Sequence, residues 1–201
     1  MLYHVIDVEV PPAKVNSALE GLAPALSRGS GTLRACWYSE IGRLNRVLAI
    51  REYASAERLG EDQREILTST DPFGVAGVAT AVTCDTYATF PGVQFLPPGK
   101  LGPIFEVRTY RLKRDGLAAT FAAWDKVREA RAKLSPLTVM YATSGQVPRF
   151  MHIWPYATLN DRLAIRDAAV KQGIWPPPGG LAHIETMQSE IFLPAAFSPI
   201  Q

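Results

Sequence analysis

The pattern of apolar and polar positions divides the second half of the chain into a regular series of elements. Residues 104–112 are β-branched and aromatic, which predicts a strand. Residues 117–134 are rich in alanine and carry apolar side chains at helical spacing, which predicts one long helix. The remainder predicts two strands of a hairpin, a second helix and a last strand, over residues 137–143, 149–154, 158–171 and 182–193.

Capping and breaking residues mark the ends of the second of these helices. Thr158 with Asp161 three positions later is a variant of the capping box, so we expect the helix to begin there. Gly173 ends the helix, and the proline-rich loop over 175–180 cannot continue it.

The two halves of the chain are copies of one unit. When the chain is displaced by 103 positions, Tyr38 falls on Tyr141 and Arg46 falls on Arg149, and this frame runs without a gap from residue 36 to residue 91. The first half accordingly predicts a strand, a helix, a hairpin, a helix and a strand, over residues 3–10, 12–26, 33–53, 55–67 and 78–90.

This arrangement predicts the domain organisation. We expect a degenerate first repeat over residues 1–95, a proline- and glycine-rich linker over 96–103, a second repeat over 104–194 and a C-terminal tail over 195–201.

The order β-α-β-β-α-β is that of the ferredoxin-like unit, an α+β fold with helices on one face of an antiparallel sheet. The other face of each sheet has to be covered. The two tandem units can cover each other, so we expect their sheets to pack into one intramolecular α/β barrel with the helices outside.

The composition is that of an ordinary globular protein, with 201 residues, 47% apolar and 20% charged residues and a net charge of +2. The balanced charge argues against a nucleic-acid-binding protein. No stretch has the roughly 20 apolar residues of a membrane span, and the start does not resemble a signal peptide. We expect a cytoplasmic location. Cys36 and Cys84 are expected to be buried thiols rather than a disulfide.

Several separated stretches of the second half resemble the NIPSNAP family. The resemblance lies in residues 105–112, 131–137, 152–156, 162–166, 175–176 and 185–187. It implies the dimeric α/β-barrel superfamily, in which single-unit members pair two chains, so a homodimer is one option here. Relatives in that superfamily include cofactor-free monooxygenases, lactone isomerases and haem proteins, but a shared fold does not transfer a reaction.

Strand alternation brings polar side chains of the second repeat together. Glu106, Arg108 and Tyr110 share one face of their strand, and His152 and Trp154 share a face of the hairpin strand that neighbours it. We take Arg108 as an anion-binding group, His152 as a proton-transfer group near neutral pH, and Tyr110 and Glu106 as further catalytic candidates.

A second set of residues is expected to hold the ligand. Indole rings make flat apolar walls, a phenol donates a hydrogen bond, and arginines of the second helix can approach from above. The substrate-binding candidates are Trp154, Tyr141, Arg166, Arg162 and Trp175.

Structural explanations compete with each of these assignments. Glu106 and Arg108 also fit a structural ion pair, His152 fits a buried structural histidine, and Trp154 fits a core residue. Arg162 and Arg166 are four positions apart, which is equally typical of a solvated helix face.

The sequence carries no motif for a tightly bound cofactor. Its three histidines lack the spacing of metal ligands, and phosphate-binding loops and nucleophile elbows are absent. Haem with His152 as axial ligand is a minor option.

Two hypotheses for function follow. In the first, the chain binds or transforms a small, partly apolar, anionic metabolite by proton transfer or oxygenation. In the second, it is a scaffold for protein interaction, with its partner surface on the helices or the tail.

Overall fold

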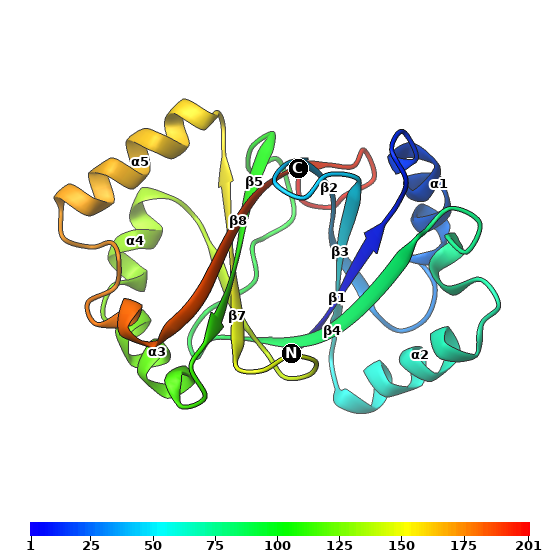
Figure 1. The fold of residues 1–201 in the computed structure, drawn as a ribbon, viewed down its shortest axis with the longest axis horizontal. Coiled ribbons are helices and arrows are strands. Elements are labelled where there is room, and N and C mark those ends of the chain that lie inside the picture. Colours follow the sequence, from blue (N-terminus) through cyan, green and yellow to red (C-terminus); the bar gives the residue numbers. More distant parts are fainter.

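The computed structural model describes residues 1–201, and its helices lie on two opposite sides of a central group of strands (Figure 1). The first half comprises β1 (Leu2–Glu9), α1 (Val15–Ala25), β2 (Thr32–Ile41), β3 (Arg46–Tyr53), α2 (Ala56–Thr68), the 3-10 turn η1 (Pro72–Gly74) and β4 (Ala81–Thr89).

The second half comprises β5 (Ile104–Leu112), α3 (Gly116–Asp125), α4 (Arg128–Leu134), β6 (Thr138–Ala142), β7 (Arg149–Tyr156), α5 (Leu159–Lys171), the 3-10 turn η2 (Gly180–His183) and β8 (Ile184–Pro194). The mixed α+β fold and the antiparallel pairing of its strands are as predicted.

The eight strands form a closed barrel in the order β1-β3-β2-β8-β5-β7-β6-β4. The strands of each half lie in the same order across the sheet. The fourth strand of the half comes first, followed by its first, third and second strands. The halves join at two short ladders. Strand β2 pairs with β8 from Trp37↔Pro194 to Ile41↔Ile191, and β4 pairs with β6 only over Tyr87↔Ala142 to Thr89↔Met140.

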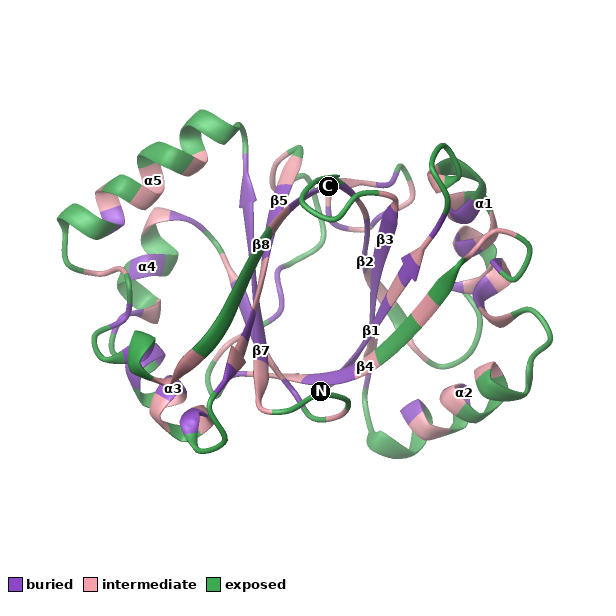
Figure 2. Ribbon diagram, in the orientation of Figure 1, coloured by how far each residue is buried: buried purple, intermediate pink, exposed green.

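The short ladders leave parts of β4 and β8 uncovered. Residues 185–189 of β8 are exposed, and Figure 2 shows this stretch and part of β4 in the colour of exposed residues. Cys84 lies in the uncovered part of β4 and is exposed, which corrects the expectation of two buried thiols. Cys36, in contrast, is a free and buried cysteine.

Three apolar clusters fill the structure. The largest lies between the two sheets and includes Trp37 stacked on Phe105, with ring centroids 4.5 Å apart. A second packs the outer face of the first sheet against α1, and a third packs the outer face of the second sheet against α3. The inside of the barrel is therefore mostly occupied by side chains of both halves.

The C-terminal tail belongs to this core. Ile200 is buried in the central cluster, the Trp37 indole donates a hydrogen bond of 3.1 Å to its carbonyl, and the backbone N–H of Cys36 donates to the Ser198 hydroxyl at 3.0 Å. The tail therefore packs against the first half.

Two local predictions differ from the structure. The helix expected over residues 117–134 is interrupted at Lys126 and Val127, where the backbone of Val127 leaves helical geometry (φ −124°). The apolar periodicity continues across this break and therefore does not reveal it. Strand β8 begins at Ile184 rather than at residue 182, because the preceding residues form η2. No helix has both the length and the hydropathy of a membrane span.

Repeat-related arginines connect the halves at the barrel mouth. Arg46 of β3 contacts Asp7 of its own half and donates two hydrogen bonds, of 2.7 and 2.9 Å, to Glu190 of β8. Its counterpart Arg149 of β7 reaches β4 of the first half, where it contacts the Asp85 carboxylate and donates to the Tyr87 hydroxyl at 2.9 Å. Arg46 and Arg149, which align in the sequence repeat, therefore each form a contact between the two halves.

Replacement of Glu190 by glutamine is expected to lower the free energy of unfolding by about 2 kcal/mol, because the largely buried Arg46 loses a charged hydrogen-bond partner. The control is Glu185→Gln on the same strand. Glu185 pairs with Arg111 in a half-exposed ion pair, and its loss should cost less than about 1 kcal/mol. Urea unfolding of both variants measures the difference. Equal losses of unfolding free energy in the two variants would contradict a stabilising role of the contact between Arg46 and Glu190.

Candidate functional site

Three neighbouring strands of the second half set the positions of the candidate residues. Strand β5 lies between β7 and β8, and Arg108 stands opposite His152 on one side and Ser189 on the other. Glu106 stands opposite Trp154. These side chains lie on the outer face of the sheet, which α3, α4 and α5 cover. The inner face of β5 carries Phe105 and Val107 instead.

Glu106 is completely buried and holds the polar cluster together. Its Oε1 atom accepts hydrogen bonds from Arg108 Nη1 (2.7 Å), Arg162 Nη2 (2.6 Å) and Ser189 Oγ (2.7 Å). Burial alone would raise the pKa of Glu106, but the hydrogen bonds from Arg162, Ser189 and Arg108 outweigh it and lower the pKa to about 2. The carboxylate is therefore ionised at neutral pH.

Arg108 links this cluster to a phenol. Its Nε atom donates a hydrogen bond of 2.7 Å to the hydroxyl oxygen of Tyr110. Because that oxygen accepts from Arg108, the Tyr110 proton remains available for an acceptor elsewhere.

His152 is completely buried and is a neutral imidazole. Its Nδ1 atom accepts a hydrogen bond of 2.6 Å from the indole N–H of Trp154, which requires the ring proton to sit on Nε2. Burial lowers the pKa of His152 well below its ordinary value, and the nearby charge of Arg108 acts in the same direction. Proton transfer by His152 near neutral pH stays a prediction, with the neutral imidazole as the form present in the folded chain.

Aromatic rings enclose His152. The nearest are those of Tyr110 (4.8 Å), Trp124 (5.2 Å), Phe150 (5.6 Å), Trp154 (5.7 Å) and Trp175 (5.9 Å), measured between ring centroids. An axial haem ligand needs a ring nitrogen that faces the iron. This enclosed imidazole, with one nitrogen occupied by Trp154, does not fit that role. No group of three or more His, Cys, Asp or Glu side chains lies together as a metal site.

A cleft of about 260 Å³ opens beside this cluster, between the sheet, α3, α5 and the proline-rich loop. Four of the predicted site residues line it: Arg108, Tyr110, Arg166 and Trp175. Trp124 and Phe150 add further aromatic wall. The cleft is therefore mainly apolar and aromatic, with two guanidinium groups.

Arg166 differs from the other arginines of the site because it makes no hydrogen bond or ion pair. Arg162, one turn earlier on α5, is used by Glu106. Arg108 also binds Glu106. An unpartnered, partly buried guanidinium in an aromatic cleft is suited to bind an anionic group of a ligand.

The other predicted residues lie outside the cleft. Glu106, His152 and Trp154 are buried behind its wall, and Arg162 is held by Glu106. Tyr141 does not reach it, because β6 is two strands from β5. Its ring packs instead against Phe121 at 5.1 Å.

Sequence reasoning missed Arg131 as a member of the site. Its guanidinium lies 4.0 Å from the centre of the Trp154 ring, it is 2% exposed, and Nη2 donates to the Tyr156 hydroxyl at 3.4 Å. Burial lowers the pKa of Arg131. In the single helix predicted over residues 117–134, Arg131 would share a face with Trp124, seven positions earlier. That spacing was the available signal, although the structure places the two residues on separate helices, α3 and α4.

The ionised state of Glu106 predicts a specific pH dependence of stability. The pKa of Glu106 is lower in the folded chain than in the unfolded chain, so its stabilising contribution is complete above about pH 4.5 and disappears as the pH falls toward 2. The difference in unfolding free energy between the wild type and Glu106→Gln should shrink by about 3 kcal/mol over that range.

Urea unfolding of both proteins at a series of pH values measures this difference. Taking the difference removes the contribution of other acids, such as Asp62, whose pKa is also lowered. A difference that stays constant from pH 6 to pH 2 would show that the arginines do not hold Glu106 ionised.

Comparisons with known proteins find similarity to the NIPSNAP family. The model of the NIPSNAP family matches residues 105–199, the half that contains the cleft. A Protein NipSnap homolog of Dictyostelium discoideum is 26% identical over 175 residues, which cover 84% of this chain and 77% of the relative. The family model and this relative support a NIPSNAP assignment.

Solved structures with a similar fold span both halves. An anthrone oxidase-like protein has a TM-score of 0.71 at 13% identity and covers 96% of this chain and 91% of its own. A candidate monooxygenase from Fusobacterium nucleatum has a TM-score of 0.67 at 13% identity, with the same coverage. Another from Lactobacillus acidophilus has a TM-score of 0.65 at 9% identity and covers 96% and 92%. At these identities the likeness concerns the fold alone.

Proposed function

We propose that this NIPSNAP-like chain binds a small, partly apolar anion in the cleft of its second half and acts on it without a tightly bound cofactor. The observation that carries the proposal is the unpartnered Arg166 guanidinium, which lines a cleft whose other walls are mainly aromatic. An aromatic or conjugated carboxylate, or an enolate, combines the flat apolar surface and the negative oxygen that such a cleft would bind.

The charges around the cleft favour the binding of an anion. The Glu106 carboxylate binds Arg108 and Arg162 and also acts on Arg131, whereas Arg166 has no ionic partner. The charges of Arg108, Arg166 and Arg131 each lower the pKa of His152. The excess positive charge is only partly compensated within the protein. An anionic ligand would therefore gain from the field of the whole cluster as well as from Arg166.

Each residue at the cleft has a distinct part in the proposal. Arg166 and Arg108 bind the anionic oxygen atoms, and Trp175 and Trp124 pack on the faces of the ligand. Tyr110 donates its proton to a ligand oxygen that gains negative charge during proton transfer or oxygenation. Glu106 and His152 act as positioning residues, because they hold Arg108 and Trp154 from behind the wall.

The proposal treats residues 1–95 and 104–194 as tandem NIPSNAP-like repeats that close one intramolecular barrel. The equal strand order in the two halves and the crossing contacts of Arg46 and Arg149 support this view. A second copy of the chain is then unnecessary for the barrel, and a homodimer would use another surface.

A scaffold function has one observation in its favour. Leu159, Leu163 and Val170 of α5 are 48%, 56% and 56% exposed, and they follow one side of the helix at spacings of four and seven positions. A partner helix could bind there, beside the cleft, whose rim includes Val170.

Binding of 2-naphthoate tests the proposal, with 2-naphthamide as the neutral analogue of the same shape. Quenching of tryptophan fluorescence should report binding, because Trp124 and Trp175 line the cleft. We expect Arg166→Met to weaken 2-naphthoate binding by about tenfold, the effect of one charge-assisted contact. The amide should bind weakly to both proteins.

Arg64→Met on α2 is the matched control, since Arg64 is an exposed arginine on the corresponding helix of the first half. It should leave the affinity unchanged. Equal affinities for the carboxylate and the amide, or equal effects of the two arginine variants, would contradict anion binding in the cleft and favour the scaffold function.

A further inference from the structure

The first half contains a second cavity that the proposed function does not use. It lies between α1, α2 and η1 and has a volume of about 460 Å³, larger than the cleft of the second half. The two occupy corresponding places in the repeat, because Pro72 and Phe73 of η1 align with Trp175 and Pro176 at the displacement of 103 positions.

The chemistry of this cavity differs from that of the cleft. Only three of its 14 lining residues are hydrophobic, and five are charged: Arg28, Arg51, Asp62, Glu65 and Asp71. Ile6 and Ala49 stand at the strand positions that align with Arg108 and His152, so the polar groups of this half come from α2 and Arg51 instead.

The floor of the cavity is a fixed polar network. The Asp62 carboxylate accepts hydrogen bonds from the backbone N–H groups of Ser30 and Gly31 and from the Tyr53 hydroxyl (3.0 Å). Arg51 forms an ion pair of 3.3 Å with Asp62, and its Nη2 atom donates to two backbone carbonyls. These contacts fix the Arg51 guanidinium in place.

Buried polar atoms at this floor lack partners. Arg51 is 3% exposed, and its Nε–H makes no hydrogen bond. His4, which stands opposite Arg51 in the ladder of β1 and β3, is completely buried with both ring nitrogens unpartnered. Buried polar groups in folded proteins are normally satisfied, so these atoms point to a missing ligand or water.

Phe73 separates His4 from the cavity. Its ring centroid is 6.3 Å from that of His4, and its side chain lines the cavity. The backbone of Phe73 has a positive φ of 61°, which is rare for a bulky residue and costs free energy. The strained residue therefore sits where a ligand would meet the unpartnered atoms.

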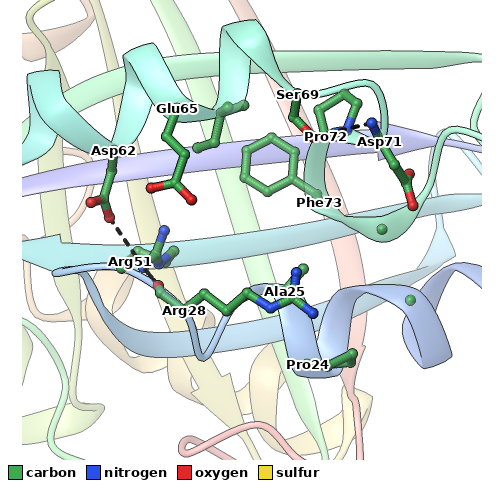
Figure 3. Close-up of a pocket in the computed structure, with 14 residues that line it drawn as sticks. Pro24, Ala25, Arg28, Arg51, Asp62, Glu65, Ser69, Asp71, Pro72 and Phe73 are labelled. Carbon is green, nitrogen blue, oxygen red and sulfur yellow. Dashed lines mark hydrogen bonds and ion pairs between the residues drawn. The ribbon is translucent and has the colours of Figure 1, made fainter.

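Two side chains of opposite charge reach the cavity from its two sides and are not engaged with each other. Figure 3 shows Glu65 reaching down from α2 and Arg28 lying along the α1 side. Neither side chain makes a hydrogen bond or an ion pair in the structure. The cavity thus presents a free carboxylate and a free guanidinium above a floor that includes Arg51, whose Nε–H is unpartnered.

We infer that this cavity is a second ligand site, which takes a small zwitterion of the amino-acid class. The ammonium group of the ligand binds Glu65, and its carboxylate binds Arg28 and the floor beside Arg51. A carboxylate alone would face the acidic groups Glu65 and Asp71, and an amine alone would leave Arg28 unpaired. The inference is independent of the anion cleft in the second half.

A thermal-shift screen of the common L-amino acids, each at millimolar concentration, tests this site. We expect at least one to raise the melting temperature, because a ligand that binds only the folded chain stabilises it. Titration calorimetry then compares that amino acid with the amine that lacks its carboxylate and the acid that lacks its amino group. Both analogues should bind at least tenfold more weakly.

Variants locate the binding. Glu65→Gln and Arg28→Gln should each raise the Kd at least tenfold, whereas Glu61→Gln and Arg64→Gln, which change exposed residues of α2 outside the cavity, should not. Arg166→Met should also leave the Kd unchanged, since Arg166 lines the other cleft. Circular dichroism checks that each variant is folded.

Three results would overturn the inference. They are no stabilisation by any amino acid, an unchanged Kd in both Glu65→Gln and Arg28→Gln, or loss of binding in Arg166→Met alone. The last result would assign the amino acid to the cleft of the second half.

Discussion

The contact between the inner faces of two four-stranded sheets is the constraint on which the rest of the structure depends. Each sheet has an apolar inner face that would be unstable in water, and each covers the other. Phe105 and Val107 of one half meet Trp37 and Leu48 of the other in the same cluster, and the C-terminal tail closes it through Ile200. The inner faces of the two sheets therefore form the interface that holds the halves together.

This packing of the inner faces determines where ligands can bind. The space left inside the barrel is a cavity of about 190 Å³. Both of the cavities discussed above are larger and lie between a sheet and its helices. The same alternation that sends Phe105 inward sends Glu106 and Arg108 outward. Arg108 and Tyr110 on the outer face can therefore line a cleft, whereas Phe105 and Val107 on the inner face hold the halves together.

The two outer faces have diverged at matched positions. Glu106 and Trp154 face each other across two strands of the second half, and His4 and Arg51 occupy the corresponding pair in the first. In the second half the acid lies on the strand and the arginines come from α5 and β5. In the first half the arginine lies on the strand, and its acid, Asp62, comes from α2. Each face thus buries a carboxylate with a guanidinium. The carboxylate lies on a strand in the second half and on a helix in the first half.

The sequence was sufficient for the order of elements and for the face of each strand residue, because both depend on local periodicity. It could place Glu106, Arg108 and Tyr110 together for the same reason. It could not tell which of them would line a cleft, since this depends on how far the helices stand from the sheet. Tyr141 was assigned to the site as a phenol that could donate a hydrogen bond, although its strand lies too far across the sheet.

The residues that sequence reasoning missed are charged residues that are usually exposed on helices but are buried in this structure. Arg131 looks like a solvated helix residue, yet it is buried over the Trp154 ring. Asp62 looks like part of the charged surface of α2, yet it receives hydrogen bonds from three residues at the base of a cavity. Burial of a charge depends on partners from distant parts of the chain, and no local pattern specifies them.

The charge balance of the second half explains why its histidine stays neutral and why the cleft remains suited to an anion. Glu106 can compensate only part of the charge of the four arginines around it, and its low pKa means that it already contributes fully at neutral pH. Protonation of His152 would add a further positive charge in a buried position, which the lowered pKa opposes. The remaining way to reduce the repulsion is a negative group from outside, and Arg166 is the arginine at the cleft with no partner of its own. Anion binding and stability should therefore be coupled in this half of the molecule.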